Sequence, residues 1–187
     1  MIGLCAILIF YPIFTISQQF NLYLQNNVGV SKELAATAQS ILFVTSVGGK
    51  FVFGWLCDRF PTRQVIMVCC LVMFLSTVML VGFISPATIF VFLIPFGLGY
   101  GGTFVLIQLL TVESFGLTDI GKILGAITLI ETTGGFLGSL ITGRLASMNN
   151  GDYTLAFYGV TVAAGLAFLS TFAVNVLSKR LSAAKVG

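Results

Sequence analysis

Six long apolar stretches constrain the fold of this chain more than any other feature. Each holds about 20 or more mostly apolar residues, the length that an α-helix needs to cross about 30 Å of hydrocarbon. Only helices and closed barrels satisfy every backbone hydrogen bond inside a bilayer. We therefore predict an all-α membrane protein, with residues 1–187 forming one bundle of six transmembrane helices. The expected spans run from Ile2 to Leu24, Leu34 to Cys57, Val65 to Ile84, Ala87 to Val112, Ile123 to Leu145 and Thr154 to Leu177.

The composition excludes several classes of protein. Hydrophobic residues make up 57% of the chain and charged residues only 8%, whereas about a quarter of a soluble domain is charged. The sequence has no histidine, which removes the commonest metal ligand and the commonest general base. It also offers no paired nucleophile and base, so we expect neither an enzyme nor a metal or cofactor site. Its four cysteines lie within or beside apolar segments, and we interpret them as packing residues.

The charged residues gather in the short loops between the expected spans. If both termini lie on one side, the other side holds only Lys32 and Arg144. The positive-inside rule then places both termini in the cytoplasm, and we expect an integral protein of the plasma membrane. The net charge of +3 reflects this orientation, and no basic run interleaved with aromatic residues indicates a nucleic-acid partner. The basic residues on the cytoplasmic side are Arg59, Arg63, Lys122, Lys179, Arg180 and Lys185.

Glycines recur in the fourth and fifth expected spans. Missing side chains let helix backbones approach closely, which is how helices associate in lipid. The spacing of four residues therefore predicts close helix contacts, although glycine-rich helices can also bend or slide. The pairs are Gly97/Gly101, Gly121/Gly125 and Gly134/Gly138.

Two charged residues interrupt the apolar spans. Lys50 lies eight residues before Asp58, or roughly 12 Å of helix rise from the loop that follows. Its ammonium can either reach the headgroups or face a water-filled cavity and bind an anion. Glu131 lies about nine residues into the fifth span, near the bilayer centre. It can serve as a partner for Lys50, carry a proton, or form a hydrogen bond between helices.

Several neutral polar residues within the spans are further candidates for contact with a solute. Hydrogen bonds between helices explain each of them equally well. They are Gln18, Gln19, Asn21, Gln39, Gln108, Thr132 and Thr133.

The segment "GWLCDRFPTR" resembles the cytoplasmic loop signature of the major facilitator superfamily. Gly54, Asp58, Arg59 and Arg63 match the signature, whereas the residues between Arg59 and Arg63 depart from its usual glycine and extra basic residues. The resemblance implies a gate, because in that family this loop holds the cytoplasmic helix ends together in one transport state.

Two further segments, "PFGLGYG" and "LGAITLIETTGGFLGSLITGRL", are similar to the C-terminal half of monocarboxylate transporters and oxalate/formate exchangers. In that group a cation four residues before the signature glycine contacts the substrate carboxylate, and Lys50 occupies this position. Lysine replaces the usual arginine, which exchanges a bidentate fork for a point charge. Ser46 stands where animal members carry an acidic residue linked to proton coupling, which leaves Glu131 as the candidate proton carrier.

The resemblance covers one six-helix half of a two-half transporter. It implies secondary active transport of a small, monocarboxylate-like organic anion by alternating access, as a symporter or antiporter, with a proton as the candidate coupling ion. The missing N-terminal half or a second subunit would cover the remaining face of the bundle. The alternatives are a non-transporting membrane scaffold and a facilitator for a neutral solute.

Overall fold

The computed structural model describes residues 2–83 and 85–184. Six of its helices are long and apolar enough to cross a membrane, and the described residues contain no strand, so the all-α class is confirmed. Lys185, used in the orientation argument, lies outside the described residues. The helices are α1 (Ile2–Tyr23), α2 (Lys32–Cys57), α3 (Thr62–Phe83), α4 (Ile89–Phe115), α5 (Ile120–Met148) and α6 (Thr154–Ala184), with a π-helical turn η1 (Leu24–Val28) after α1.

Local chemistry fixes where these helices begin and end. Ser31 caps α2, because its hydroxyl accepts a hydrogen bond of 3.2 Å from the backbone N–H of Leu34. Gly29 and Gly116 end η1 and α4, both with φ of 73°, a conformation that glycine adopts without strain. Helix α5 extends three residues past the expected span at both ends, whereas α4 begins two residues later than expected and extends three residues past the expected end. Apolarity sets where a span ends, whereas backbone hydrogen bonds carry a helix on through polar residues.

The six helices pack as two related sets of three. Helix α2 packs chiefly on α4, and α5 packs chiefly on α1. Helices α3 and α6 contact each other and cover the other side of α1 and α4, which we call the two central helices. Exchanging α1–α3 with α4–α6 therefore reproduces the main contacts, as expected for an internal inverted repeat. In α1 and α4, 56% of the most apolar stretch is buried, whereas the share is 22% in α2 and 28% in α5. Helices α2 and α5 thus leave most of their surface open to another part of the protein or to lipid.

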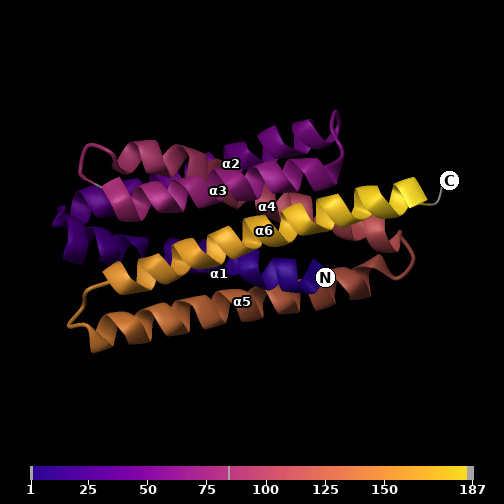
Figure 1. Ribbon diagram of the computed structural model, residues 1–187. Helices are drawn as coiled ribbons and strands as arrows, with labels where there is room; N and C mark the ends of the chain where they lie inside the picture. The colour runs from indigo at the N-terminus through magenta and orange to yellow at the C-terminus, as the bar shows by residue number, and fades with distance from the viewer. Residues whose placement is uncertain (1, 84, 185–187) are drawn as a thin grey trace.

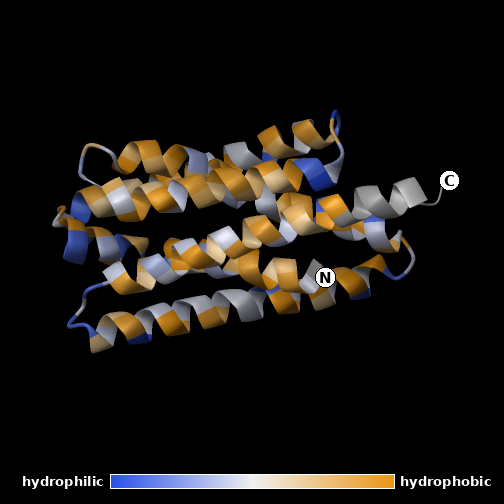
Figure 2. Cartoon of the chain, viewed as in Figure 1, coloured by the Kyte–Doolittle hydropathy of each residue, from blue (hydrophilic) through white to orange (hydrophobic). Residues whose placement is uncertain are grey.

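The two ends of the bundle differ in charge. Helix α1 begins and α6 ends at the same end of the bundle, next to the α2–α3 and α4–α5 loops (Figure 1). We call this the basic end, because Arg59, Arg63 and Lys122 lie there, and the other the opposite end. Hydrophobic residues dominate the middle of the bundle and hydrophilic residues its two ends (Figure 2). This banding is the pattern expected of helices that cross a bilayer.

Glycines make the α2–α4 contact very close. A Cβ on Gly49 or Gly101 would overlap the backbone of Leu98 or Ser46, so only hydrogen fits at either position. Gly97 likewise leaves room for the Thr45 hydroxyl. We call this contact the α2–α4 seam. It confirms the close packing predicted for Gly97 and Gly101.

The α1–α5 seam, formed where α5 packs on α1, also depends on glycine. A Cβ on Gly134 would lie 2.8 Å from the backbone oxygen of Ile7, and one on Gly138 would lie 2.5 Å from Thr15 Oγ1. The third glycine pair behaves differently, and the prediction for it is wrong. Nothing lies within 4 Å of a Cβ on Gly121 or Gly125, because both positions lie on the open face of α5.

Candidate functional site

Lys50 is exposed on the surface of the six-helix unit, and its neighbours on α2 show which side of that helix it occupies. Phe43 and Gln39 lie seven and eleven residues earlier, which are two and three helical turns, so all three share that side. The amide of Gln39 donates a 2.9 Å hydrogen bond to the backbone oxygen of Ser17 on α1. The ring of Phe43 lies 6.3 Å from that of Tyr100 on α4. Lys50 therefore lies on the side of α2 that is turned toward the two central helices.

The Lys50 ammonium has no acidic partner within the described part of the chain, where Lys122 and Asp119 form the one ion pair. An unpaired ammonium at this depth requires water, an anion or a group from another part of the protein. Lys50 thus lies on the side of α2 turned toward α1 and α4, with no described acidic group to balance its charge.

Glu131 lies in the α1–α5 seam and is only 8% exposed. It is one turn before Gly134 and Gly135 on the face of α5 that packs against α1. No described residue forms a hydrogen bond or ion pair with it, and Lys50 is on a helix that packs on a different central helix. The structure therefore does not bring Lys50 and Glu131 together as a pair.

The internal repeat relates Glu131 to Ser46. Gly49 and Gly134 hold similar places, since each approaches a backbone oxygen of the central helix against which it packs. Ser46 precedes Gly49 by three residues, and Glu131 precedes Gly134 by three. Glu131 thus provides on α5 a carboxyl at the position that a neutral hydroxyl occupies on α2.

The residues of the predicted gate loop lie at the basic end, from the last turn of α2 to the first turn of α3. Asp58 caps the C-terminus of α2, and its backbone N–H donates to the oxygen of Gly54 at 3.3 Å. The Arg59 guanidinium lies 4.1 Å from the centre of the Trp55 ring, a cation–π contact. Arg63 is exposed in the first turn of α3. Within the described residues, none of these three charged side chains forms an ion pair.

A hydrogen bond at the basic end involves a residue that sequence reasoning missed. The buried hydroxyl of Thr62, at the start of α3, donates to the carboxylate of Glu113 in the last turn of α4. The expected fourth span ended at Val112, one residue before Glu113, so Glu113 lay outside the candidates. An acidic residue just past a span and opposite a basic loop was the available signal.

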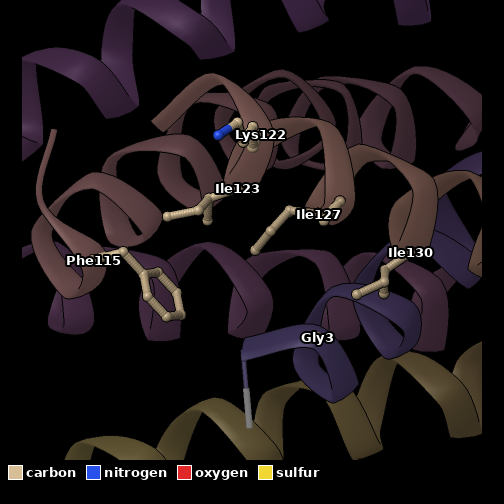
Figure 3. A pocket seen from close by; sticks show the side chains of 7 residues that line it. Gly3, Phe115, Lys122, Ile123, Ile127 and Ile130 are labelled. Carbon is tan, nitrogen blue, oxygen red and sulfur yellow. The ribbon is translucent and has the colours of Figure 1, made fainter. Parts of the chain in front are cut away.

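A hollow of about 600 Å³ opens at the basic end between the start of α1, the end of α4 and the start of α5. Its walls are mainly apolar, and Lys122 supplies the one ammonium among its lining residues (Figure 3). Asp119 lies 2.8 Å from that ammonium and balances its charge. The hollow is therefore a weaker candidate for anion binding than the surroundings of Lys50. Its lining residues are Gly3, Phe115, Lys122, Ile123, Ala126, Ile127 and Ile130.

A polar network joins η1 to the α5–α6 turn at the opposite end. The side-chain amide of Asn27 donates to the carboxylate of Asp152 and, at 2.9 Å, to the hydroxyl of Thr154. The Asn27 side-chain oxygen accepts from the backbone N–H of Tyr153 at 3.1 Å. The pKa of Asp152 is lowered because the hydroxyl and backbone N–H of Thr154, and then Asn27, donate to its carboxylate.

The other polar candidates are mostly engaged in structural bonds. Gln19 and Gln39 donate across helix interfaces to backbone oxygens, whereas Thr132 and Thr133 bond to carbonyls of their own helix. Asn21 accepts from Gln25. These contacts support the helix-to-helix interpretation for the two glutamines.

Comparisons with known proteins identify the class. The family model described as Major Facilitator Superfamily matches residues 2–185, so the chain belongs to this superfamily of membrane transport proteins. Monocarboxylate transporter 12 of Homo sapiens is 32% identical over 144 residues, which are 70% of this chain and 26% of that protein. The Xenopus laevis protein of the same name is 31% identical over 135 residues, covering 70% of this chain and 29% of that protein.

The similarity extends beyond vertebrates. The MFS transporter asaE of Aspergillus flavus is 30% identical over 149 residues, which are 76% of this chain and 33% of that protein. The chain thus spans about a third or less of the length of these relatives. The family assignment confirms the resemblance found in the loop signature and in the glycine-rich spans.

Proposed function

We propose that the chain forms one half of a transporter that moves a small organic anion of the monocarboxylate class by alternating access. The single observation that carries the proposal is the position of Lys50, an unpaired cation within a span, on the side of α2 turned toward α1 and α4. A bilayer-spanning protein keeps such a charge at substantial cost, so it is usually functional. The names of the vertebrate relatives support the same class of solute.

In this proposal Lys50 binds the carboxylate as a point charge. A charge-assisted hydrogen bond in a site that excludes water contributes roughly 1.5–3 kcal/mol, which is a factor of about 10 to 100 in binding. Tyr100 lies beside Phe43 on the same inner side and supplies a hydroxyl-bearing ring from α4. The anion would therefore sit between α2 and the central helices.

Glu131 is the proposed proton carrier. It is buried without a partner among the described side chains, and an ionisable group within a span is usually functional. Its place on α5 corresponds to that of Ser46 on α2, so the acidic group belongs to the other repeat of the same bundle. Proton coupling would then act from the α1–α5 seam.

The loop of Gly54, Asp58, Arg59 and Arg63 is the proposed cytoplasmic gate. Its charged side chains lie at one end and form no ion pair within the described chain, so they remain available to a partner. A missing first half or a second subunit would supply that partner, and both termini would lie in the cytoplasm of a cell whose plasma membrane holds the protein.

Uptake into proteoliposomes tests the proposal, with and without a supplied first half. We expect Lys50→Gln to lower carboxylate uptake about tenfold or more, and Lys50→Arg to retain most of it. Lys122→Gln is the matched control, because it removes an exposed cation from the same bundle. Carboxylate uptake that survives Lys50→Gln would remove Lys50 from the site. Uptake of a neutral solute that is equal in the unaltered protein and in Lys50→Gln would favour a different substrate class.

A further inference from the structure

Four polar side chains with buried oxygen atoms lie in the half of the α1–α5 seam nearer the opposite end. They are Thr15 and Gln19 on α1, and Ser139 and Thr142 on α5; we call them the seam cluster. The hydroxyl oxygens of Thr15, Ser139 and Thr142 and the amide oxygen of Gln19 have no hydrogen-bond partner among the described residues. Thr15 and Thr142 are completely buried. A polar group buried without a partner is costly anywhere, and most of all in a membrane.

Contacts with α5 place these residues along one stretch of the seam. Thr15 Oγ1 lies 2.5 Å from the place of a Cβ on Gly138, and the Gln19 amide lies 3.4 Å from that of Gly143. Thr142 is one turn beyond Gly138 on the same face of α5. The Gln19 amide nitrogen donates to the backbone oxygen of Ser139 at 2.7 Å. The amide oxygen of Gln19 accepts no hydrogen bond from a described residue.

Other buried hydroxyls in the bundle are satisfied differently. Thr103 and Thr111, both completely buried in α4, each donate to the carbonyl four residues earlier in their own helix at 2.7 Å. This bond is the usual solution for threonine in a membrane helix. Thr15 and Thr142 make no such bond to their own helices, and Thr15 Oγ1 lies against Gly138 of α5.

We propose that the seam cluster is a binding site for ordered water between α1 and α5. All four groups are neutral, and the three hydroxyls need both a donor and an acceptor. Water offers both and typically makes about three hydrogen bonds to buried polar groups. A monovalent cation would satisfy only the oxygen lone pairs and would leave the hydroxyl protons without an acceptor. The proposal is independent of which solute the transporter carries.

The α2–α4 seam differs from the α1–α5 seam in having, among its described residues, no unsatisfied hydroxyl that would need water. There Thr45 and Ser46 bond to carbonyls of their own helix, and the glycine contacts leave no room between the backbones. The α1–α5 seam combines glycines with hydroxyls that lack a described partner, so its two helices are joined through water as well as through direct contact. Water-joined helices can shift relative to each other while exchanging hydrogen bonds.

The sign of a valine substitution tests the proposal. If water links the cluster, Thr142→Val removes one of its partners, and we expect the melting temperature of the protein in lipid nanodiscs to fall by about 2–4 °C more than for the control Thr111→Val. If the cluster is dry, the same substitution deletes an unsatisfied hydroxyl and raises the melting temperature. A rise would therefore overturn the proposal.

A measurement on the unaltered protein keeps the test independent of whether a variant folds. In water-edited solid-state NMR of the chain in bilayers, signals of Thr15 and Thr142 should gain magnetisation from water at least about three times faster than those of Thr103 and Thr111. Equal transfer to all four threonines would overturn the water site. Stabilisation by sodium but not potassium, abolished by Thr142→Val, would also overturn it and indicate a cation instead.

Discussion

The α2–α4 seam and the α1–α5 seam hold equivalent places in the internal repeat, but they are packed differently. In the α2–α4 seam, a Cβ on Gly49 or Gly101 would overlap backbone atoms, and the neighbouring hydroxyls are satisfied within α2. In the α1–α5 seam the equivalent distances are 2.5–2.8 Å, and four polar atoms lack a described partner. The same spacing of glycines thus gives a direct, fully satisfied contact in one repeat and a looser, polar contact in the other.

This difference suggests which parts of the bundle move as units. Backbone-to-backbone contact leaves α2 and α4 no alternative arrangement, because any shift would create overlap or an empty space. The α1–α5 seam has polar groups that can exchange partners, and it also holds Glu131. We therefore expect α2 and α4 to move together, and changes between transport states to involve α1 against α5.

The two repeats also share a bond at their helix ends. At the basic end Glu113, in the last turn of α4, accepts from Thr62 at the start of α3. At the opposite end Asn27, just after α1, donates to Thr154 at the start of α6. Each bond ties the end of a central helix to the start of the outer helix from the other repeat. The repeat is thus retained in its polar contacts as well as in its packing.

The largest expected effect comes from filling the α2–α4 seam. Gly101→Ala places a methyl group on the backbone of Ser46, which cannot move aside as a flexible side chain can. We expect a loss of about 3 kcal/mol or more in the free energy of unfolding, or failure to fold. A thiol-reactive dye can follow unfolding, since Cys69 and Cys70 are buried. A loss below about 1 kcal/mol would show that this seam is no tighter than its counterpart.

Much of this fold could be predicted from the sequence, because a bilayer limits the possible solutions. Six apolar stretches of sufficient length can only be spanning helices, and glycines four residues apart indicate close contacts. The spacing could not distinguish Gly134 and Gly138, which meet α1, from Gly121 and Gly125, which face open space. That distinction depends on which face of α5 packs, and periodicity is weak in a helix that is apolar on all sides.

The candidate site was less predictable for a physical reason. The depth of Lys50 follows from counting residues, but the side of α2 on which it lies follows only from the contacts of Gln39 and Phe43. Glu113 was missed because apolarity ends before the helix does. Of the seam cluster only Gln19 was among the polar candidates, since nothing in a sequence shows whether a threonine bonds to its own helix.

Filling the α1–α5 seam should cost less. Gly138→Ala meets the hydroxyl of Thr15 first, a side chain that can rotate toward its own helix, and the backbone oxygen of Tyr11 at 2.8 Å second. We expect a loss of about 1–2 kcal/mol in the same unfolding assay. Adding Thr15→Ala should recover part of that loss, because it removes the hydroxyl that the new methyl group meets. A loss equal to that of Gly101→Ala would contradict the proposed difference between the seams.

Loosening the network at the opposite end should have a smaller effect. Asn27→Ala removes hydrogen bonds to Asp152, Thr154 and the backbone of Tyr153, all near the surface, and we expect a loss of about 1 kcal/mol. Thr62→Val removes the equivalent bond at the basic end and serves as the matched comparison. If Asn27→Ala leaves the melting temperature unchanged, the network does not hold α1 in place.

The effect of Asn27→Ala should also depend on pH. The pKa of Asp152 in the folded protein lies below its ordinary value of 3.8, so its carboxylate contributes stability above pH 3.8 that is lost as the pH falls through the lower value. Melting temperatures of the unaltered protein and the variant should differ by a constant amount from pH 8 to about 5 and converge in more acidic solution. A difference that persists unchanged at pH 3 would show that the amide bonds without help from the carboxylate.

The smallest effect should come from Gly125→Ala, and its sign separates glycines that pack from glycines that do not. Gly125 lies on the open face of α5, with nothing within 4 Å of a Cβ, so a methyl group meets no obstacle in this chain. Alanine favours a helix over glycine, and we expect a change within about 0.5 kcal/mol, neutral or stabilising. The same variant measured with the other half of the transporter supplied gives a second result. A loss that occurs only in that assembly would place Gly125 in the contact between the halves, whereas a loss in the chain alone would mean that α5 packs on another face.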